Sequence, residues 1–563
     1  MKNVETWRLT EVRKKLPEAM MRLADFLIIV TMTLSILIFI LWPITAVLLK
    51  SLFVDGQFTL ELYGEILPGN MEYLFNSVLV AVLSTGLALL ISTCIAVYEC
   101  YSRSRFKGFV MPMLLMTMIS PPFVSSLAYI TLFGRRGFIT NTLLGLSVNP
   151  YGWHGIVIMQ ALGEISFTAL LLIGVLRGLD SRIIHASRDL GASSIDTLRR
   201  VVLPLLIPGI RAAGFIAFVK SLADFGTPIV IGGKFSVLAT EAYMMVISRG
   251  DLSKAAVLSV MILIPAVTAI MFYQRSGDME VFTGMSGLGA KTREGDLNLT
   301  RTVEVVLNVI TWTFLAIMVL QSVTIILTAI TRYSSSGYIF TSEYLANFHY
   351  DKYGTIIRSL LYSFFAGIFA SVIGVLLAYY VERRRIVCGR ILDFIASLPY
   401  ITPGTFFGIG YVLAFHNGPL VLTGTAMIVI INCIFRQVTV ASKSGSAVLA
   451  TISPDLENAA KDLGTPRLFI LKDIMIPLLR PAFLVSFVNT FTTTMMTIGS
   501  IIFIISPSSK VATVELFGLI NQGHYGEAAV MASILTFVTV MVNLFFVKLL
   551  SDKKEKKDAT NES

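Results

Sequence analysis

A few ionisable and amide side chains interrupt the long apolar stretches of this sequence, and they are the first candidates for chemistry. Glu164 lies in one stretch, Arg436 and Gln437 lie in another, and Lys220 and Asp224 lie four residues apart in a third. Ionisable groups are costly in such surroundings and usually face a cavity or a partner. We therefore expect them to line a solute pathway or to pair, Glu164 with Arg436 between segments and Lys220 with Asp224 on one helix face. Asp224 could instead face a cationic solute.

Proline residues mark two further places where a solute could pass. Pro121–Pro122 would break one apolar helix, and Pro399 with Pro403 would break another. Broken helices deep in a membrane line cavities or are buried in protein. Tyr129 and Tyr411 follow the two breaks and are pathway candidates, although packing of the kinked helices and of the two rings is the simpler interpretation.

Covalent or metal chemistry has no comparable candidates in the sequence. We find no Ser/His/Asp arrangement, no CxxC pair and no GxxxxGK[ST] loop that could cradle a nucleotide phosphate. Two scattered histidines, His154 and His416, do not make an iron site, so a metal site stays unassigned. The four cysteines are best interpreted as small buried apolar side chains: Cys94, Cys100, Cys388 and Cys433.

The composition explains why the polar residues stand out. Of the 563 residues, 55% are hydrophobic and only 14% are charged, and the mean hydropathy is +0.77. Soluble domains carry about 25% charged residues, so lipid is the expected solvent. A disordered, collagenous or disulfide-stapled chain is excluded. The net charge of +10 sits in short basic runs beside apolar segments, which is typical of cytoplasmic loops rather than of nucleic-acid binding.

At about 20 residues per crossing, the apolar segments predict an all-α membrane protein with about twelve transmembrane helices. We place them at 24–50, 73–98, 109–133, 155–176, 203–223, 254–274, 304–331, 356–381, 390–415, 421–441, 475–505 and 526–550. Basic residues gather in alternate loops and in the tail, which predicts that both termini are cytoplasmic. Residues 1–23 are a cytoplasmic segment rather than a cleaved signal, because the apolar run after them is too long.

The two halves of the chain repeat each other. Glycine, proline and tyrosine positions recur at nearly constant intervals, the pairs being Gly191 with Gly464, Pro204 with Pro477, Pro208 with Pro481, and Tyr129 with Tyr411. Six spans in each half make the repeats parallel, with a pathway between them along the membrane normal. We divide the chain into a first repeat (24–275), a cytoplasmic linker (276–303), a second repeat (304–550) and a basic cytoplasmic tail (551–563).

The most informative repeated element lies in the cytoplasmic loop between the fourth and fifth span of each half. We call these loops the first Gly-centred segment (180–204) and the second Gly-centred segment (453–477). Asp180 and Ser453 are suited to cap a helix, and Gly191 and Gly464 to end it in the left-handed conformation, before a second helix and a proline. Such a stiff, partly apolar helix pair could transmit force from a soluble partner. An amphipathic connector resting on the lipid headgroups is the alternative.

The spacing inside both segments resembles the EAA loop of permeases in binding-protein-dependent ATP-binding-cassette importers. That pattern is Glu-Ala-Ala, then Gly, then Leu-Pro at fixed distances. The first segment matches it with His185, Ala186, Ser187, Asp189, Gly191 and Pro204, and the second with Asn458, Ala459, Ala460, Asp462, Gly464 and Pro477. Both copies lack the leading glutamate, and Glu457 sits one place early.

The resemblance covers nearly the whole chain and is nearest to fused two-repeat permeases of the ferric-iron branch, which is related to thiamine and 2-aminoethylphosphonate permeases. It implies a type I importer permease fold in a bacterial cytoplasmic membrane. It also implies that each Gly-centred segment docks as a coupling helix on one of two separate ATPase subunits, which bind the ATP and magnesium. An extracytoplasmic binding protein would deliver the solute. The chain itself would then need no cofactor and would not be an enzyme.

Ferric iron is the solute that the resemblance favours, and 2-aminoethylphosphonate or another small anionic solute is the alternative. A function of another class, an ion-coupled secondary transporter, would also suit parallel repeats but would need no ATPase. A membrane enzyme or scaffold would call for a reactive cluster or a large soluble domain, and the sequence contains neither.

Overall fold

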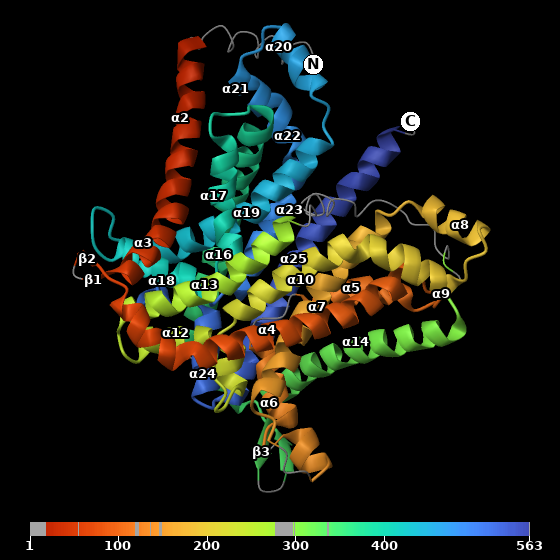
Figure 1. Ribbon diagram of the computed structural model, residues 1–563, viewed down its shortest axis with the longest axis vertical. Coiled ribbons are helices and arrows are strands. Elements are labelled where there is room, and N and C mark those ends of the chain that lie inside the picture. Colours follow the sequence, from red (N-terminus) through yellow and green to blue (C-terminus); the bar gives the residue numbers. More distant parts are fainter. Residues whose placement is uncertain are drawn as a thin grey trace.

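A computed structural model describes residues 18–54, 56–118, 123–135, 137–145, 149–275, 297, 299–334, 337–348 and 350–561 (Figure 1). Within these residues the chain is almost entirely helical, because backbone groups in lipid must find their hydrogen-bond partners inside the segment. Four expected features lie wholly or mostly outside the described residues: the N-terminal segment, Pro121–Pro122, the linker 276–303 and the side chains of the basic tail.

The first half contains one long N-terminal helix, a core of three long helices, and shorter helices between them. The N-terminal helix consists of α2 (Glu18–Ile36), the π-helical turn η1 (Leu37–Leu41) and α3 (Trp42–Leu52). The core helices α4 (Glu61–Tyr101), α7 (Trp153–Arg177) and α10 (Leu203–Ala223) pack on one another. The other elements are η2 (Lys107–Phe109), α5 (Val110–Thr117), α6 (Val124–Phe133), η3 (Phe138–Leu143), α8 (Ser181–Asp189), α9 (Ser194–Thr197), η4 (Leu198–Val202), α11 (Gly226–Ile231), α12 (Leu238–Ile247) and α13 (Leu252–Arg275).

The second half follows the same order of elements. It begins with α14 (Arg301–Ile330), and its core helices α16 (Tyr350–Ala378), α19 (Ala426–Ala450) and α23 (Arg480–Met496) again pack on one another. The other elements are α15 (Glu343–Ala346), η6 (Tyr379–Arg383), α17 (Gly389–Ile401), α18 (Gly404–Phe415), α20 (Asp455–Asp462), α21 (Arg467–Phe469), η7 (Ile470–Met475), α22 (Ile476–Leu478), η8 (Pro507–Ser509), α24 (Ala512–Asn521) and α25 (Tyr525–Asn561). The repeat seen in the sequence is therefore also a repeat of structure.

A short β-hairpin follows the first helix of each half, which the expectation of an all-α chain did not include. β1 (Phe53–Val54) pairs antiparallel with β2 (Gln57–Phe58), and β3 (Thr331–Ser334) pairs antiparallel with β4 (Gly337–Phe340). These two-stranded hairpins leave the helical fold class unchanged. In Figure 1 they lie on the opposite side of the molecule from α8 and α20.

Nine helices among the described residues are long and apolar enough to cross a membrane, and a tenth crossing counts if the bent pair α17–α18 is one span. That pair bends by 113° where Pro403, which has no N–H, separates the two helices. The two other expected spans take a different form. The span expected at 109–133 is the short pair α5 and α6, and the span expected at 475–505 contains the 17-residue α23 followed by non-helical residues.

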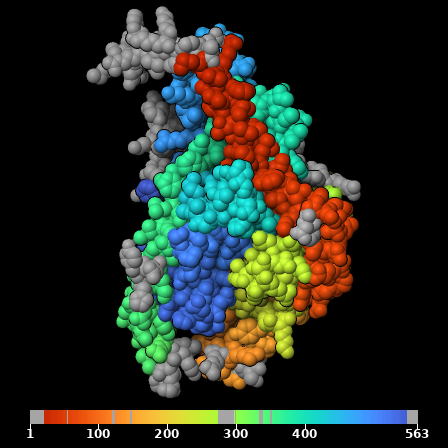
Figure 2. All heavy atoms as spheres, turned by 90° about the vertical axis from the view of Figure 1, so that its left-hand side faces the viewer, coloured from red at the N-terminus to blue at the C-terminus, as the bar shows by residue number. Residues whose placement is uncertain are grey.

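The first helix of each half packs against the other half. The N-terminal helix contacts α17, α18 and α19, and Figure 2 shows it (red) running diagonally beside residues of the second half. The carboxylate of Asp25 joins the N-terminal helix to η6. It accepts a hydrogen bond from the Tyr380 hydroxyl (2.8 Å) and forms an ion pair with Arg384 (2.5 Å). In return, α14 contacts α4, α5 and α6, and Glu304 accepts a hydrogen bond from Ser102 (2.8 Å). The two repeats are therefore interlocked.

Candidate coupling and pathway sites

The first Gly-centred segment folds as two short helices joined at a left-handed glycine. Asp180 caps α8, because its carboxylate accepts a hydrogen bond from the Arg182 backbone N–H (2.9 Å). The Arg182 side chain also donates to this carboxylate, and that hydrogen bond is the largest cause that lowers the pKa of Asp180. Gly191 has φ +85°, and the Ser193 hydroxyl then caps α9 by accepting from the Asp196 N–H. The predicted cap and glycine break are confirmed.

A single apolar side chain anchors α8 to the helices behind it. Ile184 is the buried residue of this helix. The hydroxyls of Ser187 and Thr197 lie 3.0 Å apart and join α8 to α9. The tip beyond α8 is uncovered, since Leu190 is 89% exposed.

The second Gly-centred segment has the same shape. The Ser453 hydroxyl accepts a hydrogen bond from the Asp455 N–H (3.2 Å), as predicted for a cap, and Pro454 already has helical backbone angles. Gly464 has φ +73°, and Leu463 beside it is 86% exposed. One exposed leucine on a surface is ordinary. Here, however, the exposed leucine recurs at equivalent tips of two equivalent helices.

An ion pair anchors α20, and sequence reasoning missed it. Glu457 is buried, and its Oε1 lies 3.7 Å from Nε of Arg383 in η6. Arg383 also donates to the backbone carbonyls of Leu449 (2.7 Å) and Ile452, so it joins η6, the end of α19 and α20. Glu457 occupies the place that Ile184 has in the first half. The displaced glutamate of the EAA-like pattern was the signal that could have indicated this pair.

Most other predicted residues of these two segments lie at the surface. The exposed ones are His185, Ala186, Asp189, Gly191, Asn458, Ala459, Asp462 and Gly464, whereas Ser187 is half-buried and Ala460 is buried. Pro204 and Pro477 lie in the first turns of α10 and α22, each directly after a π-helical turn. In Figure 1 the helices α8 and α20 lie on the same side as the C-terminal end of α25.

Glu164 and Arg436 do not form an ion pair in this structure. The Oε2 atom of Glu164 instead lies 3.1 Å from Nζ of Lys220, and that ammonium lies 4.4 Å from the centre of the Phe167 ring. The expected pair of Lys220 with Asp224 is therefore wrong. The reason is that α10 ends at Ala223, so Asp224 has extended backbone angles and leaves the helix face.

Asp224 belongs to a complete internal hydrogen-bond network. Its Oδ1 accepts from the backbone N–H groups of Gly226 (3.0 Å) and Thr227 (3.1 Å), and its Oδ2 accepts from the Gln160 amide (3.0 Å). The Ser221 hydroxyl donates to the other end of that amide (2.6 Å). Asp224 thus supports the turn between α10 and α11, and it is not a free ligand for a cation in this structure.

The equivalent place in the second half has different side chains. Cys433, Thr494 and Thr497 stand where the first half has its network of glutamine, serine and aspartate. Two predicted pathway residues lie beside them on α19. Gln437 is buried, and Arg436 is half-buried with its Nη1 atom fully buried.

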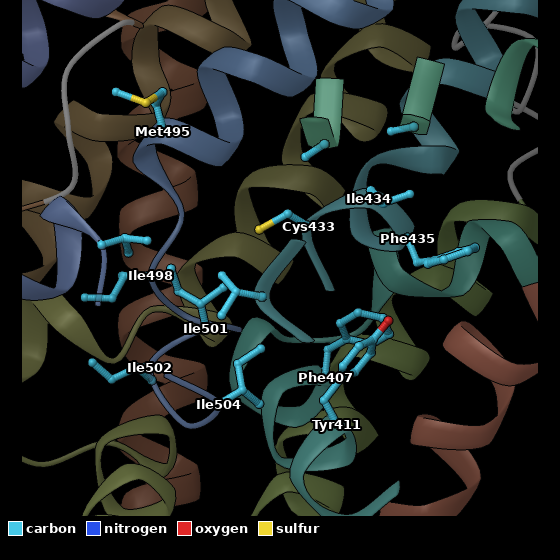
Figure 3. Packing of buried hydrophobic residues seen from close by; sticks show 14 of the residues in the cluster. Phe407, Tyr411, Cys433, Ile434, Phe435, Met495, Ile498, Ile501, Ile502 and Ile504 are labelled. Carbon is cyan, nitrogen blue, oxygen red and sulfur yellow. The ribbon is translucent and has the colours of Figure 1, made fainter. Parts of the chain in front are cut away.

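Tyr129 and Tyr411 serve packing in this structure, which was the simpler interpretation. The Tyr129 hydroxyl donates to the carbonyl of Pro150 (2.9 Å), and the Tyr411 hydroxyl donates to the carbonyl of Phe39 in η1 (2.8 Å). Both rings are buried, and Figure 3 shows Tyr411 against Phe407. These equivalent residues therefore anchor different neighbours, a loop in the first half and the crossing N-terminal helix in the second.

Aromatic rings from both halves meet between the repeats, and no pattern in the sequence predicts this contact. Phe517 lies 5.0 Å from Phe123 and 6.0 Å from Phe225, and Tyr243 lies 6.0 Å from Phe503, measured between ring centres. Gly226 makes room for this contact, because a Cβ atom there would lie 2.0 Å from the Phe123 ring. The two repeats thus touch through aromatic rings.

Cysteine and histidine residues offer no cluster for a metal in the described ranges. No group of three or more His, Cys, Asp or Glu side chains in those ranges could hold a metal ion. Cys100 and Cys433 are buried and Cys94 is half-buried, in line with the sequence interpretation. The interpretation is wrong for Cys388, which is exposed because it lies in the turn between η6 and α17.

Comparison with known proteins matches both halves to one family. The family model described as "Binding-protein-dependent transport system inner membrane component" matches residues 88–278 and 370–556. The "Ferric transport system permease protein FbpB" of Actinobacillus pleuropneumoniae is 28% identical over 566 residues, which cover 93% of this chain and 78% of that protein. A Haemophilus influenzae protein named FbpB 1 is 30% identical over 514 residues, 85% of this chain and 77% of that protein. The "Molybdenum transport system permease protein ModB" of Mycobacterium tuberculosis is 29% identical over 212 residues, 36% of this chain and 78% of that protein.

Proposed function

The chain belongs to the family of binding-protein-dependent transport system inner membrane components, and we propose that it is the fused two-repeat permease of an ATP-driven importer of ferric iron. Its homologues are transport permeases, and its apolar helices make it an integral membrane protein.

The observation that carries the proposal is the pair of Gly-centred segments. Each ends a short helix with a left-handed glycine beside a leucine that is 89% exposed in one copy and 86% in the other. Burying a leucine side chain contributes about 1.5–3 kcal/mol, so two such tips favour docking onto soluble protein. We assign one ATPase subunit to each segment, with ATP and magnesium bound by those subunits and no cofactor held by this chain.

The proposal also sets the orientation of the protein in the membrane. The Gly-centred segments and the basic tail face the cytoplasm in this proposal, since basic residues gather on that side. The hairpins β1–β2 and β3–β4 then lie at the opposite, extracytoplasmic face, where a solute-binding protein would dock. Both termini are cytoplasmic.

The mechanism requires movement and no covalent chemistry from this chain. Closure of the ATPase pair on ATP would bring α8 and α20 closer together and rock the two repeats against each other. Because the repeats are interlocked, the N-terminal helix would move with the second repeat, and α14 would move with the first. The aromatic contact of Phe517 with Phe123 and Phe225 would have to open for solute to pass.

Similarity to the two FbpB proteins along most of the chain supports ferric iron as the cargo. The second candidate is a small anion. It is favoured by the shorter match to ModB and by a match of 27% identity over 204 residues to Salmonella typhimurium PhnV, whose name refers to 2-aminoethylphosphonate transport.

A reconstituted complex in proteoliposomes tests the proposal. The permease would be combined with its ATPase and with a binding protein loaded with ferric iron, and ATP hydrolysis and iron uptake would be measured. We expect the iron-loaded binding protein to stimulate hydrolysis several-fold and drive uptake. Stimulation only by a phosphonate-loaded or molybdate-loaded binding protein would change the assigned cargo from ferric iron to that anion. Uptake by the purified chain under an ion gradient without ATPase would contradict the proposed function.

A further inference from the structure

The Arg436 side chain is half-buried, and no counter-charge lies beside it in the described part of the chain. It lies near the middle of α19, about 15 Å from the helix start at 1.5 Å per residue. Its Nη1 atom is fully buried and has no hydrogen-bond partner. No ion pair in the described part of the chain involves this guanidinium. Buried charges in proteins are normally paired, so this guanidinium, whose Nη1 atom is buried, calls for a partner that the described residues do not supply.

Further unpaired polar groups lie around this guanidinium. Asn432, one helical turn earlier on the same face of α19, is fully buried, and neither its amide nitrogen nor its oxygen has a partner. Gly404 of α18 and Gly499 of the segment after α23 approach closely, because a Cβ on Gly404 would lie 3.0 Å from the Arg436 Nη1 and 3.2 Å from the Gly499 carbonyl carbon. The hydroxyls of Thr405 and Ser500, the next residues along the chain, are also buried and unpaired.

The first half has no such set at the equivalent place. Met159 and Gly163 stand where the second half has Asn432 and Arg436. The neighbouring polar groups of the first half complete their hydrogen bonds within the network around Asp224. Buried polar groups are usually paired, so a cluster of unpaired polar groups that the described residues show in the second repeat indicates a ligand of that repeat.

We propose that Arg436 and Asn432 bind a small inorganic oxyanion, such as phosphate, between α18, α19 and the segment 497–505. A guanidinium matches an oxyanion with two parallel hydrogen bonds, and the asparagine amide adds a further donor. The guanidinium lies directly against the backbone at Gly404, since a Cβ there would lie 3.0 Å from Nη1 and 3.1 Å from Nη2 of Arg436.

The depth of the site favours a free anion over the phosphate of a lipid headgroup. Arg436 is about 15 Å from the start of α19, which is half the thickness of a membrane core. The inference rests on the proposed function only for the route by which an anion reaches this depth. It does not depend on ferric iron as the cargo.

Binding of radiolabelled phosphate to the full-length protein in lipid-free detergent tests the site. We expect saturable binding with one site per chain, weakened at least tenfold by Arg436→Gln and several-fold by Asn432→Leu. Arg358→Gln is the matched control, since Nε of Arg358 already donates to the Lys510 carbonyl (2.8 Å), and binding should be unchanged. Arg436→Lys keeps the charge but not the two parallel bonds, and it should bind weakly even if the glutamine variant fails to fold.

Two results would overturn the inference: no saturable binding by the unaltered protein, or equal binding by the Arg436→Lys variant and the unaltered protein. Displacement of phosphate by short-chain phosphatidylglycerol but not by sulfate would assign the site to a lipid instead. Iron uptake is measured separately in proteoliposomes. Phosphate binding without iron uptake would contradict ferric iron as the cargo and support the oxyanion site. Iron uptake without phosphate binding would support ferric iron and contradict the oxyanion site.

Discussion

The two Gly-centred segments have the same outward shape and different inward attachments. Both present a left-handed glycine beside an exposed leucine. Behind that tip, Ile184 anchors α8 by apolar contact, whereas Glu457 anchors α20 by an ion pair with Arg383. The repeat therefore preserves the exposed tip and varies the interior that holds it. Experiments on the tips and on the anchors should therefore give different results.

The largest effect is expected at the tips. Leu190→Asp and Leu463→Asp should each reduce binding-protein-stimulated ATP hydrolysis at least tenfold, because loss of about 1.5–3 kcal/mol of apolar burial weakens docking by that order. The measurement is ATP hydrolysis by the reconstituted complex. Val387→Asp is the control, since Val387 is 94% exposed and lies outside both segments. Full stimulation in either leucine variant would contradict an equal role for the two tips.

Exchanging the anchors should have the next largest effect. Ile184→Glu would bury a carboxylate without an arginine placed as Arg383 is beside Glu457, and it should destabilise the protein by about 3 kcal/mol or more. Glu457→Ile should cost less, about 1–3 kcal/mol, because Arg383 keeps its bonds to the Leu449 and Ile452 carbonyls. Thermal denaturation in detergent, followed by tryptophan fluorescence, compares the two. Equal losses of melting temperature would show that the anchors do not differ as described.

A third comparison concerns the hydrogen-bond network around Asp224 in the first half and the equivalent position, Thr497, in the second. Asp224→Ala removes three hydrogen bonds to a carboxylate and should cost about 2–3 kcal/mol. Thr497→Ala removes one hydroxyl bond to the Thr493 carbonyl and should cost less than about 1 kcal/mol. The same denaturation measurement applies. A larger loss from the threonine change would reverse the comparison.

The smallest effect concerns the two helix caps. Asp180→Ala and Ser453→Ala should each speed amide hydrogen exchange at the capped residue, Arg182 or Asp455, by a few-fold without loss of transport. The caps should differ in their response to pH. Because Arg182 holds the pKa of Asp180 below its ordinary value, its cap is complete at neutral pH and is lost only as pH falls through that lowered pKa. The Ser453 cap should not change, so equal acid sensitivity of both caps would be contrary to this account.

Local chemistry made much of this architecture predictable. The caps at Asp180 and Ser453 and the breaks at Gly191 and Gly464 follow from side-chain and backbone preferences that act over a few residues. The repeat and most spans follow from apolar run length and from matched proline and glycine positions. These features depend on the chain's own neighbours in sequence, so they do not require knowledge of the packing.

The remaining features depend on contacts between distant segments. Apolar residues predict that residues 24–50 form a helix, but nothing in them indicates that this helix lies against α18 of the other half. The same limit applies to Glu457, whose partner Arg383 is far away in the chain, and to Glu164, which pairs with Lys220 rather than Arg436. The helix end at Ala223 removed Asp224 from the expected face, and helix ends are the least predictable part of a sequence interpretation.

We propose that each Gly-centred segment holds one ATPase subunit. Native mass spectrometry of the complex, with the ATPase in excess, measures this directly. We predict two ATPase subunits on the unaltered permease, one on either the Leu190→Asp or the Leu463→Asp variant, and none on the double variant. Two subunits retained on the double variant, or none on the unaltered permease, would contradict the claim.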